Sequence, residues 1–480
     1  MSNTTQALSR IEAILDDSSF VEIGAAVTAR ATDFNMQEKK APSDGVITGY
    51  GVINGNLVYV YSQDAAVLGG TIGEMHAKKI ANLYEKAMKM GAPVIGLIDC
   101  AGLRLQEATD ALDGFGQIYK NMSLASGIVP QITAVYGECG GGLAVLAELS
   151  DFVFVEEKKA KLFVNSPNAL DGNYESKLDT SSAEFMAKAG VADFIGDEET
   201  IANGVRQLVS MLPSNEEGAV YTDNQDDLNR VCADMSAEIA DAALALTDIS
   251  DDGLFVEVKA EYAKEMVTGF IQLDGVTVGA VANRTAIYDE NGEKAEEFAA
   301  VLTTDGAYKA AEFVTFCNAF EIPVLSLTNV KGFEANVRAE KTIAKAAAKL
   351  VYAFSNADVP KVNVITGEAY GSAYVAMNSK SVGADMVYAW SQASIGMMDA
   401  SLAAKIMYAD EIAAADDVTA KINEKASEYA ALQSSVEQAA ARGYVDTIIN
   451  PEDTRKYIIA AFEMLFDKRE VRADKKHGTV

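Results

Sequence analysis

The sequence predicts an α/β protein that consists of two homologous domains in tandem. The chain has 480 residues, which is too long for one ordinary hydrophobic core. Several segments occur twice in the same order, and in each half short apolar runs alternate with helical patterns. Such a β-α-β alternation is typical of parallel strands that are joined by right-handed helical crossovers.

An internal repeat covers the central part of each half. The segment "PVIGLIDCAG" at Pro93 recurs as "PVLSLTNVKG" at Pro323, an offset of 230 residues. The segment "VPQITAVYGECGGGLAV" at Val129 recurs as "VPKVNVITGEAYGSAYV" at Val359, again with an offset of 230. Two long matches at one offset predict that the halves share a fold.

The repeat also locates an insertion and a domain boundary. Upstream, "TGYGVINGNLVYV" at Thr48 matches "TGFIQLDGVTVGA" at Thr268 with an offset of only 220. About ten extra residues are therefore expected in the second half, in the polar stretch 284–297. We predict an N-terminal domain over residues 1–245 and a C-terminal domain over residues 246–480. They would join near residues 240–252, where "LTDISDDG" supplies turn residues.

Hydrophobic patterning predicts the main elements of each half. A helix is expected from Ile72 to Met90, because apolar residues recur there three to five positions apart. The tail from about Ser401 is Ala-rich and helical in pattern. Apolar runs of the buried-strand type cover Pro93–Asp99, Ile132–Tyr136, Pro323–Thr328 and Val362–Thr366.

Composition and charge exclude several classes of function. The formal net charge is −30, which would repel nucleic acid, so we expect no nucleic-acid partner. An anionic substrate would need basic residues gathered locally. The N-terminus has no basic segment followed by an apolar one, and no apolar run approaches the length of a membrane span, so we expect a cytoplasmic protein.

Histidine and cysteine are scarce, which limits side-chain chemistry. The only histidines are His76, inside the predicted helix, and His477, close to the C-terminus. The four cysteines form no CxxC pair. We therefore expect no metal site, no histidine-based catalysis and reduced, buried thiols.

Two glycine turns stand at equivalent positions of the repeat. Gly137–Gly142 ("GECGGG") and Gly367–Ala373 ("GEAYGSA") each follow a predicted strand and open a helical pattern. Glycine permits a sharp turn and a close approach of the backbone to a ligand. The helix N-terminus behind it presents unpaired N–H groups and the positive end of the helix dipole. The turns could form oxyanion holes, or the glycines could serve only close helix–strand packing.

The tetrapeptide Ala87-Met88-Lys89-Met90 matches the sequence on which biotin carrier domains bear their cofactor. A carrier needs that lysine on a tight hairpin between β-strands. Here Lys89 falls on the polar side of the predicted helix, and Gly91 would end that helix. We therefore predict that Lys89 carries no biotin.

Over nearly its whole length the chain resembles the carboxyltransferase subunits of biotin-dependent acyl-CoA carboxylases and decarboxylases, such as those for propionyl-CoA and methylmalonyl-CoA. The similar segments include "SDGVITGYGVINGNLVYVYSQD", "GGTIGEMHAKKI", "GAPVIGLIDCAGLRLQEA", "GECGGG", "VPKVNVITGEAYGSAY" and "ARGYVDTIINPEDTRKYI". The resemblance implies a crotonase-like fold in each half and a hexamer built as a dimer of trimers. It implies no metal.

The resemblance also implies a reaction and its partners. The N-terminal half would bind a coenzyme A thioester, and the C-terminal half would bind carboxybiotin carried on a separate carrier protein. The further partner would be a biotin carboxylase subunit or a membrane decarboxylase subunit. Biotin, once freed of carbon dioxide, would remove the α-proton of the thioester, which needs no histidine. The acyl chain (propionyl, methylmalonyl or acetyl) and the direction of the reaction stay open.

The same resemblance assigns residues to the two turns. The N–H groups of Gly141 and Gly142 would hold the enolate oxygen of the thioester. Those of Ser372 and Ala373 would hold the ureido oxygen of biotin. Further substrate-binding positions are Gly140, Gly371 and Val375, the last at a place where the family lines the acyl pocket, often with Asp.

Two loops depart from the family pattern. The family usually has "DSGGAR" where this chain has "DCAGLR" at 99–104, and "VPGFLPG" where this chain has "VKGFEAN" at 330–336. Arg104 could be a substrate-binding loop cation or part of a structural ion pair. Lys331 could bind a substrate carboxylate or phosphate, or be a solvated lysine.

Glu138 and Glu368 lie beside the turns, and we favour helix N-terminal acids over catalytic roles. If Glu138 acted as an acid or base, the protein could be a crotonase-type enzyme that works on acyl-CoA without biotin. A non-catalytic carboxyltransferase-like subunit is the third alternative.

Overall fold

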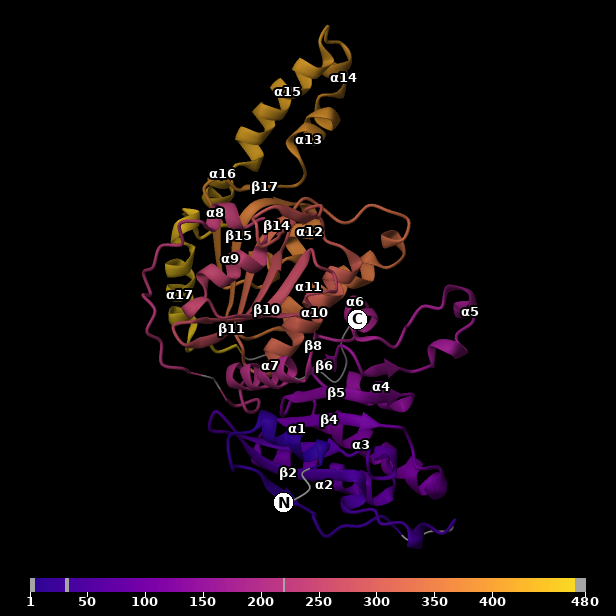
Figure 1. Ribbon diagram of the computed structural model, residues 1–480. Coiled ribbons are helices and arrows are strands. Elements are labelled where there is room, and N and C mark those ends of the chain that lie inside the picture. The colour runs from indigo at the N-terminus through magenta and orange to yellow at the C-terminus, as the bar shows by residue number, and fades with distance from the viewer. Residues whose placement is uncertain (1–4, 31–33, 219–220, 471–480) are drawn as a thin grey trace. The chain divides into compact units, whose positions relative to one another are not determined.

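A computed structural model describes residues 5–30, 34–218 and 221–470 of the chain. The chain divides into two compact units. Unit 1 comprises Met1–Val220 with Lys259–Tyr262, and unit 2 comprises Tyr221–Val258 with Ala263–Val480. Each unit contains a mixed eight-stranded sheet that is flanked by helices, which confirms the predicted α/β class (Figure 1).

The sheet of unit 1 has the order β1-β2-β3-β4-β5-β6-β8, and β7 also pairs with β5. Strands β1, β2 and β3 are antiparallel, whereas β3 onward pair in parallel. The parallel strands are almost continuously apolar because helices cover them. The strands are β1 (Val21–Ile23), β2 (Val46–Ile53), β3 (Asn56–Gln63), β4 (Val94–Cys100), β5 (Gln131–Gly140), β6 (Phe152–Glu156), β7 (Lys161–Phe163) and β8 (Phe194–Gly196).

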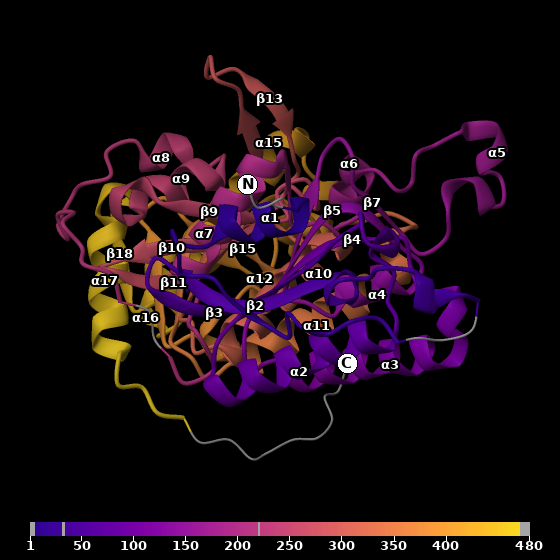
Figure 2. The same cartoon turned by 60° about the horizontal axis from the view of Figure 1, so that its bottom comes forward.

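The helices of unit 1 form its crossovers. Helices α2 and α3 pack against each other, and α1 packs against α7. Figure 2 shows α2 and α3 on one side of strands β2 and β3, and α1 on the other. The helices are α1 (Gln6–Ile14), α2 (Glu74–Met90), α3 (Ala108–Ala125), α4 (Gly142–Glu148), α5 (Asn173–Ser176), α6 (Ala183–Lys188) and α7 (Glu198–Met211).

The sheet of unit 2 repeats this topology. Its order is β9-β10-β11-β14-β15-β16-β18, and β17 pairs with β15 as β7 pairs with β5. The strands are β9 (Phe255–Val258), β10 (Met266–Leu273), β11 (Val276–Asn283), β14 (Val324–Val330), β15 (Lys361–Tyr370), β16 (Met386–Trp390), β17 (Ser394–Gly396) and β18 (Thr447–Ile449).

Unit 2 has more helices than unit 1 in the described residues. Helices α13 to α15 form an arm that extends away from the sheet of unit 2 in Figure 1, which agrees with the helical tail predicted from about Ser401. The helices are α8 (Met235–Glu238), α9 (Ala242–Ile249), α10 (Thr304–Ala319), α11 (Ile343–Asn356), α12 (Gly371–Ala376), α13 (Ala400–Met407), α14 (Ala409–Ala413), α15 (Val418–Tyr429), α16 (Val436–Ala441) and α17 (Thr454–Leu465).

The predicted repeat is confirmed at the level of elements. Strands β10 and β11 follow β2 and β3 by 220 residues, and β14 and β15 follow β4 and β5 by 230. The ten extra residues lie where the offsets require them. They contribute to a hairpin of β12 (Ala286–Tyr288) and β13 (Lys294–Glu297), which projects from its unit in Figure 2.

Each unit is held together by its own hydrophobic core. In unit 1 the buried cluster joins the sheet to α2 and α3, with Ile80, Ile98 and Ile118 fully buried. In unit 2 the central cluster joins the sheet to α9 and α17, and it contains Trp390. None of the helices in the described part of the chain combines the length and apolar character needed to cross a bilayer.

Candidate active site

The first glycine turn joins β5 to α4. Gly141 has a φ of 64° and a ψ of −127°, a conformation that residues with a side chain rarely adopt. A Cβ at Gly141 would meet nothing within 4 Å, so the space beside this peptide is open. An oxyanion hole at this turn would need such open space.

The glycines on either side of Gly141 serve packing. A Cβ at Gly140 would lie 2.8 Å from the Phe163 ring, and one at Gly142 would lie 2.6 Å from the Phe115 ring. The Tyr119 hydroxyl also donates to the Gly142 carbonyl, at 2.5 Å. Packing therefore accounts for Gly140 and Gly142 as glycines, whereas the space beside Gly141 is open. That the turn forms an oxyanion hole stays a prediction.

The N–H groups of the first turn differ in their partners. The Gly141 N–H donates to the Phe163 carbonyl at 2.8 Å, which holds the turn to β7. The Gly142 N–H stands at the first position of α4, where helical N–H groups have no intrahelical acceptor. Gly142 is exposed, so its N–H is the better placed of the two to meet a negatively charged oxygen.

The second turn joins β15 to α12, and its glycine has nearly the same φ as Gly141. Gly371 has a φ of 63°, and in the repeat it corresponds to Gly141. Ser372 corresponds to Gly142 and is exposed in the same way, whereas Ala373 is buried. A Cβ at Gly371 would lie 3.2 Å from the Met397 carbonyl.

An exposed valine follows each turn. Val375, on α12, is 36% exposed, and Val145, at the equivalent position of α4, is 43% exposed. We had no assignment for Val145 from the sequence, although its offset of 230 from Val375 could have indicated it. Both halves therefore present an apolar side chain one helical turn after the N–H groups.

Polar side chains brace the strand ends beneath the turns. In unit 2, Asn329 accepts the Glu368 N–H at 3.0 Å, and its own N–H donates to the Asn283 carboxamide at 3.0 Å. In unit 1, Asp99 occupies the place of Asn329, and its N–H donates to Gln63 at 3.3 Å. Only the repeat itself could have pointed to these residues.

Arg104 is a structural cation in unit 1. Its Nη1 donates to Asp44 at 2.5 Å and to Glu107 at 2.8 Å, and its Nη2 donates to the Thr71 carbonyl at 2.7 Å. The side chain is 1% exposed. This geometry matches the structural ion pair, the second of the two alternatives for Arg104.

Lys331 lies beside the second turn. Its Nζ is 2.7 Å from the Glu368 carboxylate, and this neighbour raises the pKa of Lys331. The lysine side chain is 56% exposed. In the first half Glu138 is exposed, and Ala101 stands where Lys331 would be. Among the residues that the structure describes, a cation therefore accompanies the glutamate of the second turn and not that of the first.

The histidine and cysteines near the first turn are poor candidates for proton transfer. Burial lowers the pKa of His76 to about 3, and its Nδ1 lies 2.9 Å from the Asp44 carbonyl oxygen. Burial raises the pKa of Cys100 to about 12 and raises that of Cys139 as well. These groups stay neutral near pH 7, while His477 lies outside the described residues.

Lys89 lies on a helix and not on a hairpin. It is in the last turn of α2, and Gly91 ends that helix with a φ of 59°. The predicted helix and its stop are confirmed, although α2 starts at Glu74 and not at Ile72, which pairs with Leu103 in an isolated bridge. That Lys89 carries no biotin stays a prediction.

Comparison with known proteins places this site in context. The model of the carboxyl transferase domain family matches residues 2–480. The alpha subunit of methylmalonyl-CoA decarboxylase from Propionigenium modestum is 39% identical over 99% of this chain and 92% of its own length. The carboxyltransferase subunit of propionyl-CoA carboxylase from Haloferax mediterranei is 40% identical over 99% of this chain and 93% of its own length.

A solved structure shares the whole fold. The transcarboxylase 12S core, crystallised as a hexamer with hydrolysed methylmalonyl-coenzyme A bound, superposes with a TM-score of 0.91 at 36% identity. The match covers 98% of this chain and 92% of the other. The two units thus have the tandem crotonase-like fold that the sequence led us to expect.

Proposed function

This chain belongs to the carboxyl transferase domain family, and from this premise we propose that it moves a carboxyl group between biotin and a short-chain acyl-CoA. The observation that carries the proposal is the pair of equivalent glycine turns, with a φ of 64° at Gly141 and 63° at Gly371. A reaction with two oxyanions, one on each partner, needs two such turns.

The first turn is assigned to the thioester. Loss of carbon dioxide from a malonyl-type thioester, or loss of its α-proton, places negative charge on the thioester oxygen. The Gly142 N–H, at the positive end of α4, stabilises that charge without a side-chain donor. Gly141 supplies the φ that opens the backbone, and the exposed Val145 lies beside the acyl group.

The second turn is assigned to biotin. The N–H groups of Ser372 and Ala373 hold the ureido oxygen, which becomes more negative when the carboxyl group leaves the ureido nitrogen. That nitrogen then takes the α-proton of the acyl-CoA, so no histidine is needed. Unit 1 would accordingly form the acyl-CoA side and unit 2 the biotin side, with biotin on a separate carrier protein.

The substrate class follows from the relatives. Their names specify propionyl-CoA and methylmalonyl-CoA, and we propose that this chain acts on one of this pair or on acetyl-CoA. Val145 and Val375 are apolar, and they favour an acyl group that carries no charge besides the carboxylate that is transferred. The same geometry serves carboxylation and decarboxylation, since the enolate is common to both.

The assembly is proposed from the solved relative. The transcarboxylase 12S core assembles as a hexamer, and we propose a hexamer, a dimer of trimers, for this chain. Its partners would be a biotin carrier protein and either a biotin carboxylase subunit or a membrane decarboxylase subunit. The site would work without a metal ion, in the cytoplasm.

A proline substitution tests the second turn. Ser372 stands near the start of α12, where proline is tolerated because the N–H has no intrahelical partner. We expect Ser372→Pro to lower biotin-dependent turnover of methylmalonyl-CoA by about 10²–10³-fold, because one oxyanion donor is lost. The measurement is the rate with purified protein, free biotin and methylmalonyl-CoA.

The matched control is Ser372→Gly, which keeps the N–H and should retain most of the parental rate. Parental turnover in Ser372→Pro would exclude this turn as the ureido site. Glu138→Gln tests the alternative without biotin: abolition of a biotin-independent reaction by this change would support a crotonase-type enzyme instead.

A further inference from the structure

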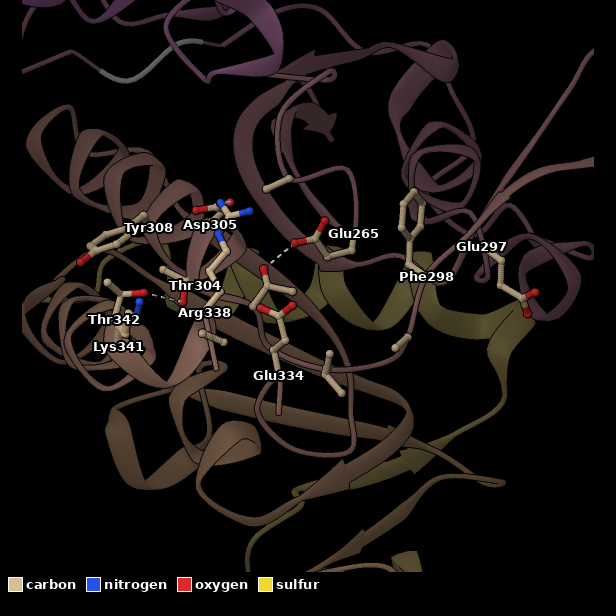
Figure 3. Close-up of a pocket in the computed structure, with 15 residues that line it drawn as sticks. Glu265, Glu297, Phe298, Thr304, Asp305, Tyr308, Glu334, Arg338, Lys341 and Thr342 are labelled. Carbon is tan, nitrogen blue, oxygen red and sulfur yellow. Dashed lines mark hydrogen bonds and ion pairs between the residues drawn. The ribbon is translucent and has the colours of Figure 1, made fainter. Parts of the chain in front are cut away.

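Unit 2 contains a cavity of about 720 Å³ that the glycine turns do not use. It lies between the end of the β12–β13 hairpin, the start of α10 and the loop after β14, and Figure 3 shows its lining. Cavities of this size accommodate whole small molecules. The lining is mixed, with carboxylates, hydroxyls and apolar groups.

The repeat shows what occupies the equivalent place in unit 1. The Arg104 N–H donates to the Ile72 carbonyl at 2.9 Å, and the Glu334 N–H donates to the Leu302 carbonyl at 3.0 Å. Ile72 and Leu302 are themselves in equivalent parallel bridges. Glu334, which lines the cavity, therefore stands at the backbone position of Arg104.

In unit 1 this region is filled by a guanidinium group. Arg104 lies between the carboxylates of Asp44 and Glu107, and all three side chains are 0–1% exposed. The group sits directly over Gly73, where a Cβ would collide with it. In unit 2, Thr303 replaces Gly73, and a carboxylate replaces the arginine.

Two carboxylates of the cavity have no cation as partner in the described part of the chain. Glu265 accepts a short hydrogen bond from the Thr303 hydroxyl, drawn as a dashed line in Figure 3. Glu334 accepts from the Asn336 carboxamide at 2.7 Å. The other acids are paired, Asp305 with Arg338 at 3.5 Å and Glu297 with Lys294 at 3.1 Å.

The two cations in the cavity lining do not take the buried position that Arg104 has in unit 1. Arg338 is 88% exposed, and Lys341 is also exposed. Four carboxylates against two exposed cations leave the lining net negative. A cation inside it would meet less solvent screening than one at the surface.

The rest of the lining suits the body of an organic molecule. Phe298 and Val301 offer apolar contacts, and the Tyr308 ring lies at the side of the cavity in Figure 3. The hydroxyls of Thr304 and Thr342, 3.2 Å apart, add polar contacts. A bare metal ion would not use the aromatic and aliphatic groups.

We propose that this cavity binds a small organic cation, with its guanidinium or primary ammonium group at Glu265 and Glu334. The ligand supplies from outside the positive charge that Arg104 supplies from within the chain in unit 1. This inference does not rest on carboxyl transfer, and its test measures binding and not turnover.

The test is calorimetric titration of the full-length protein with phenylguanidinium and with phenylurea, a neutral compound of similar shape. We expect phenylguanidinium to bind at least about tenfold more tightly, since a charge-assisted hydrogen bond to a carboxylate is lost in the urea. Glu334→Gln and Glu265→Gln should each weaken binding of the cation by about tenfold.

Glu334→Arg is the decisive variant, because it restores the arginine of unit 1. It should abolish binding of phenylguanidinium while the thermal unfolding midpoint stays at or above that of the parent. Glu290→Gln removes a carboxylate from the tip of the β12–β13 hairpin, outside the cavity, and should leave binding unchanged. Equal affinity for the two compounds, undetectable binding of the cation, or binding that survives Glu334→Arg would overturn the proposal.

Discussion

At the scale of single residues, buried charges in this protein are explained by their partners. Arg104 has both of its terminal nitrogens engaged, and Asp44 and Glu107 share it. Burial raises the pKa of Asp44, and Arg104 opposes that shift. The arginine therefore favours the charged form of this buried carboxylate, which also accepts the His76 N–H at 2.8 Å.

The first prediction concerns this cluster. Arg104→Met should lower the free energy of unfolding by about 3–5 kcal/mol, because it leaves two buried carboxylates without their cation. The measurement is chemical unfolding. The control is Arg338→Met, which changes an arginine that is 88% exposed and should stay within about 0.5 kcal/mol of the parent. Equal stability of the two variants would contradict a structural role for Arg104.

A second prediction concerns pH and rests on a difference between the two halves. Burial raises the pKa of Asp151 to about 7, and a hydrogen bond from the Gln131 N–H only partly offsets it. A carboxyl group whose pKa is raised in the folded state stabilises the fold while it is protonated. That stability is lost as the pH rises from about 4 to about 7, by no more than about 4 kcal/mol.

Asp151→Asn should remove this loss. The variant is expected to gain stability relative to the parent as the pH rises from about 4 to about 8, measured as the difference in unfolding midpoints. Asp385, at the equivalent position of unit 2, pairs with Lys468 at 2.9 Å and provides the control. Asp385→Asn should destabilise at neutral pH, whereas a constant difference between Asp151→Asn and the parent would refute the assignment.

Among the site residues, the sequence predicted some positions better than others. The turn glycines were predictable because a strand, a glycine and a helix follow one another locally. The partner of Arg104 was not, since Asp44 lies 60 residues away and only the fold brings them together. The sequence does carry one signal of the cavity, namely the exchange of Arg104 for Glu334 at an offset of 230.

At the scale of elements, the ends of helices are held by residues from the following strands. Gln131, in β5, donates to the Met122 carbonyl near the end of α3, at 3.0 Å. Lys361, its equivalent in β15, donates to the carbonyls of Phe354 and Ala357 at 2.7 and 2.6 Å. A buried lysine and a buried glutamine thus cap the C-terminal ends of the helices in equivalent crossovers.

The third prediction follows from this equivalence. Lys361→Met should destabilise the protein by about 1–3 kcal/mol for each buried carbonyl left without a donor. Lys361→Gln should recover part of that loss, because the Gln131 geometry is the precedent within the same chain. Thermal unfolding of the two variants provides the comparison, and a methionine variant as stable as the glutamine variant would exclude a capping role.

Element positions were predictable from the sequence, but their ends were not. The strand expected at Ile132–Tyr136 extends to Gly140 as β5. The extension exists because Glu138–Gly140 pair with β7, a contact between segments that are not adjacent in sequence. The part of β5 that leads into the site contains turn-forming residues, so the sequence did not predict it as strand.

At the scale of the whole molecule, one fold used twice accounts for the candidate site. The two offsets of the repeat predicted equivalent strands, equivalent turns and the place of the β12–β13 insertion, since duplicated sequence keeps its topology. What the repeat does not fix is the chemistry of each copy. Lys331 pairs with Glu368 in the second half, whereas Ala101 stands at the equivalent place of the first. The acidic cavity described above also lies in the second half.

Biotin is proposed to enter as a substrate at the second turn. The most direct test is whether the reaction requires biotin. The measurement is conversion of methylmalonyl-CoA to propionyl-CoA by the purified chain, with and without free biotin, while carboxybiotin is quantified. We expect propionyl-CoA to form only with biotin, and carboxybiotin to appear in equal amount. Conversion at the same rate without biotin, or tight binding of acyl-CoA with no turnover in the presence of biotin, would contradict it.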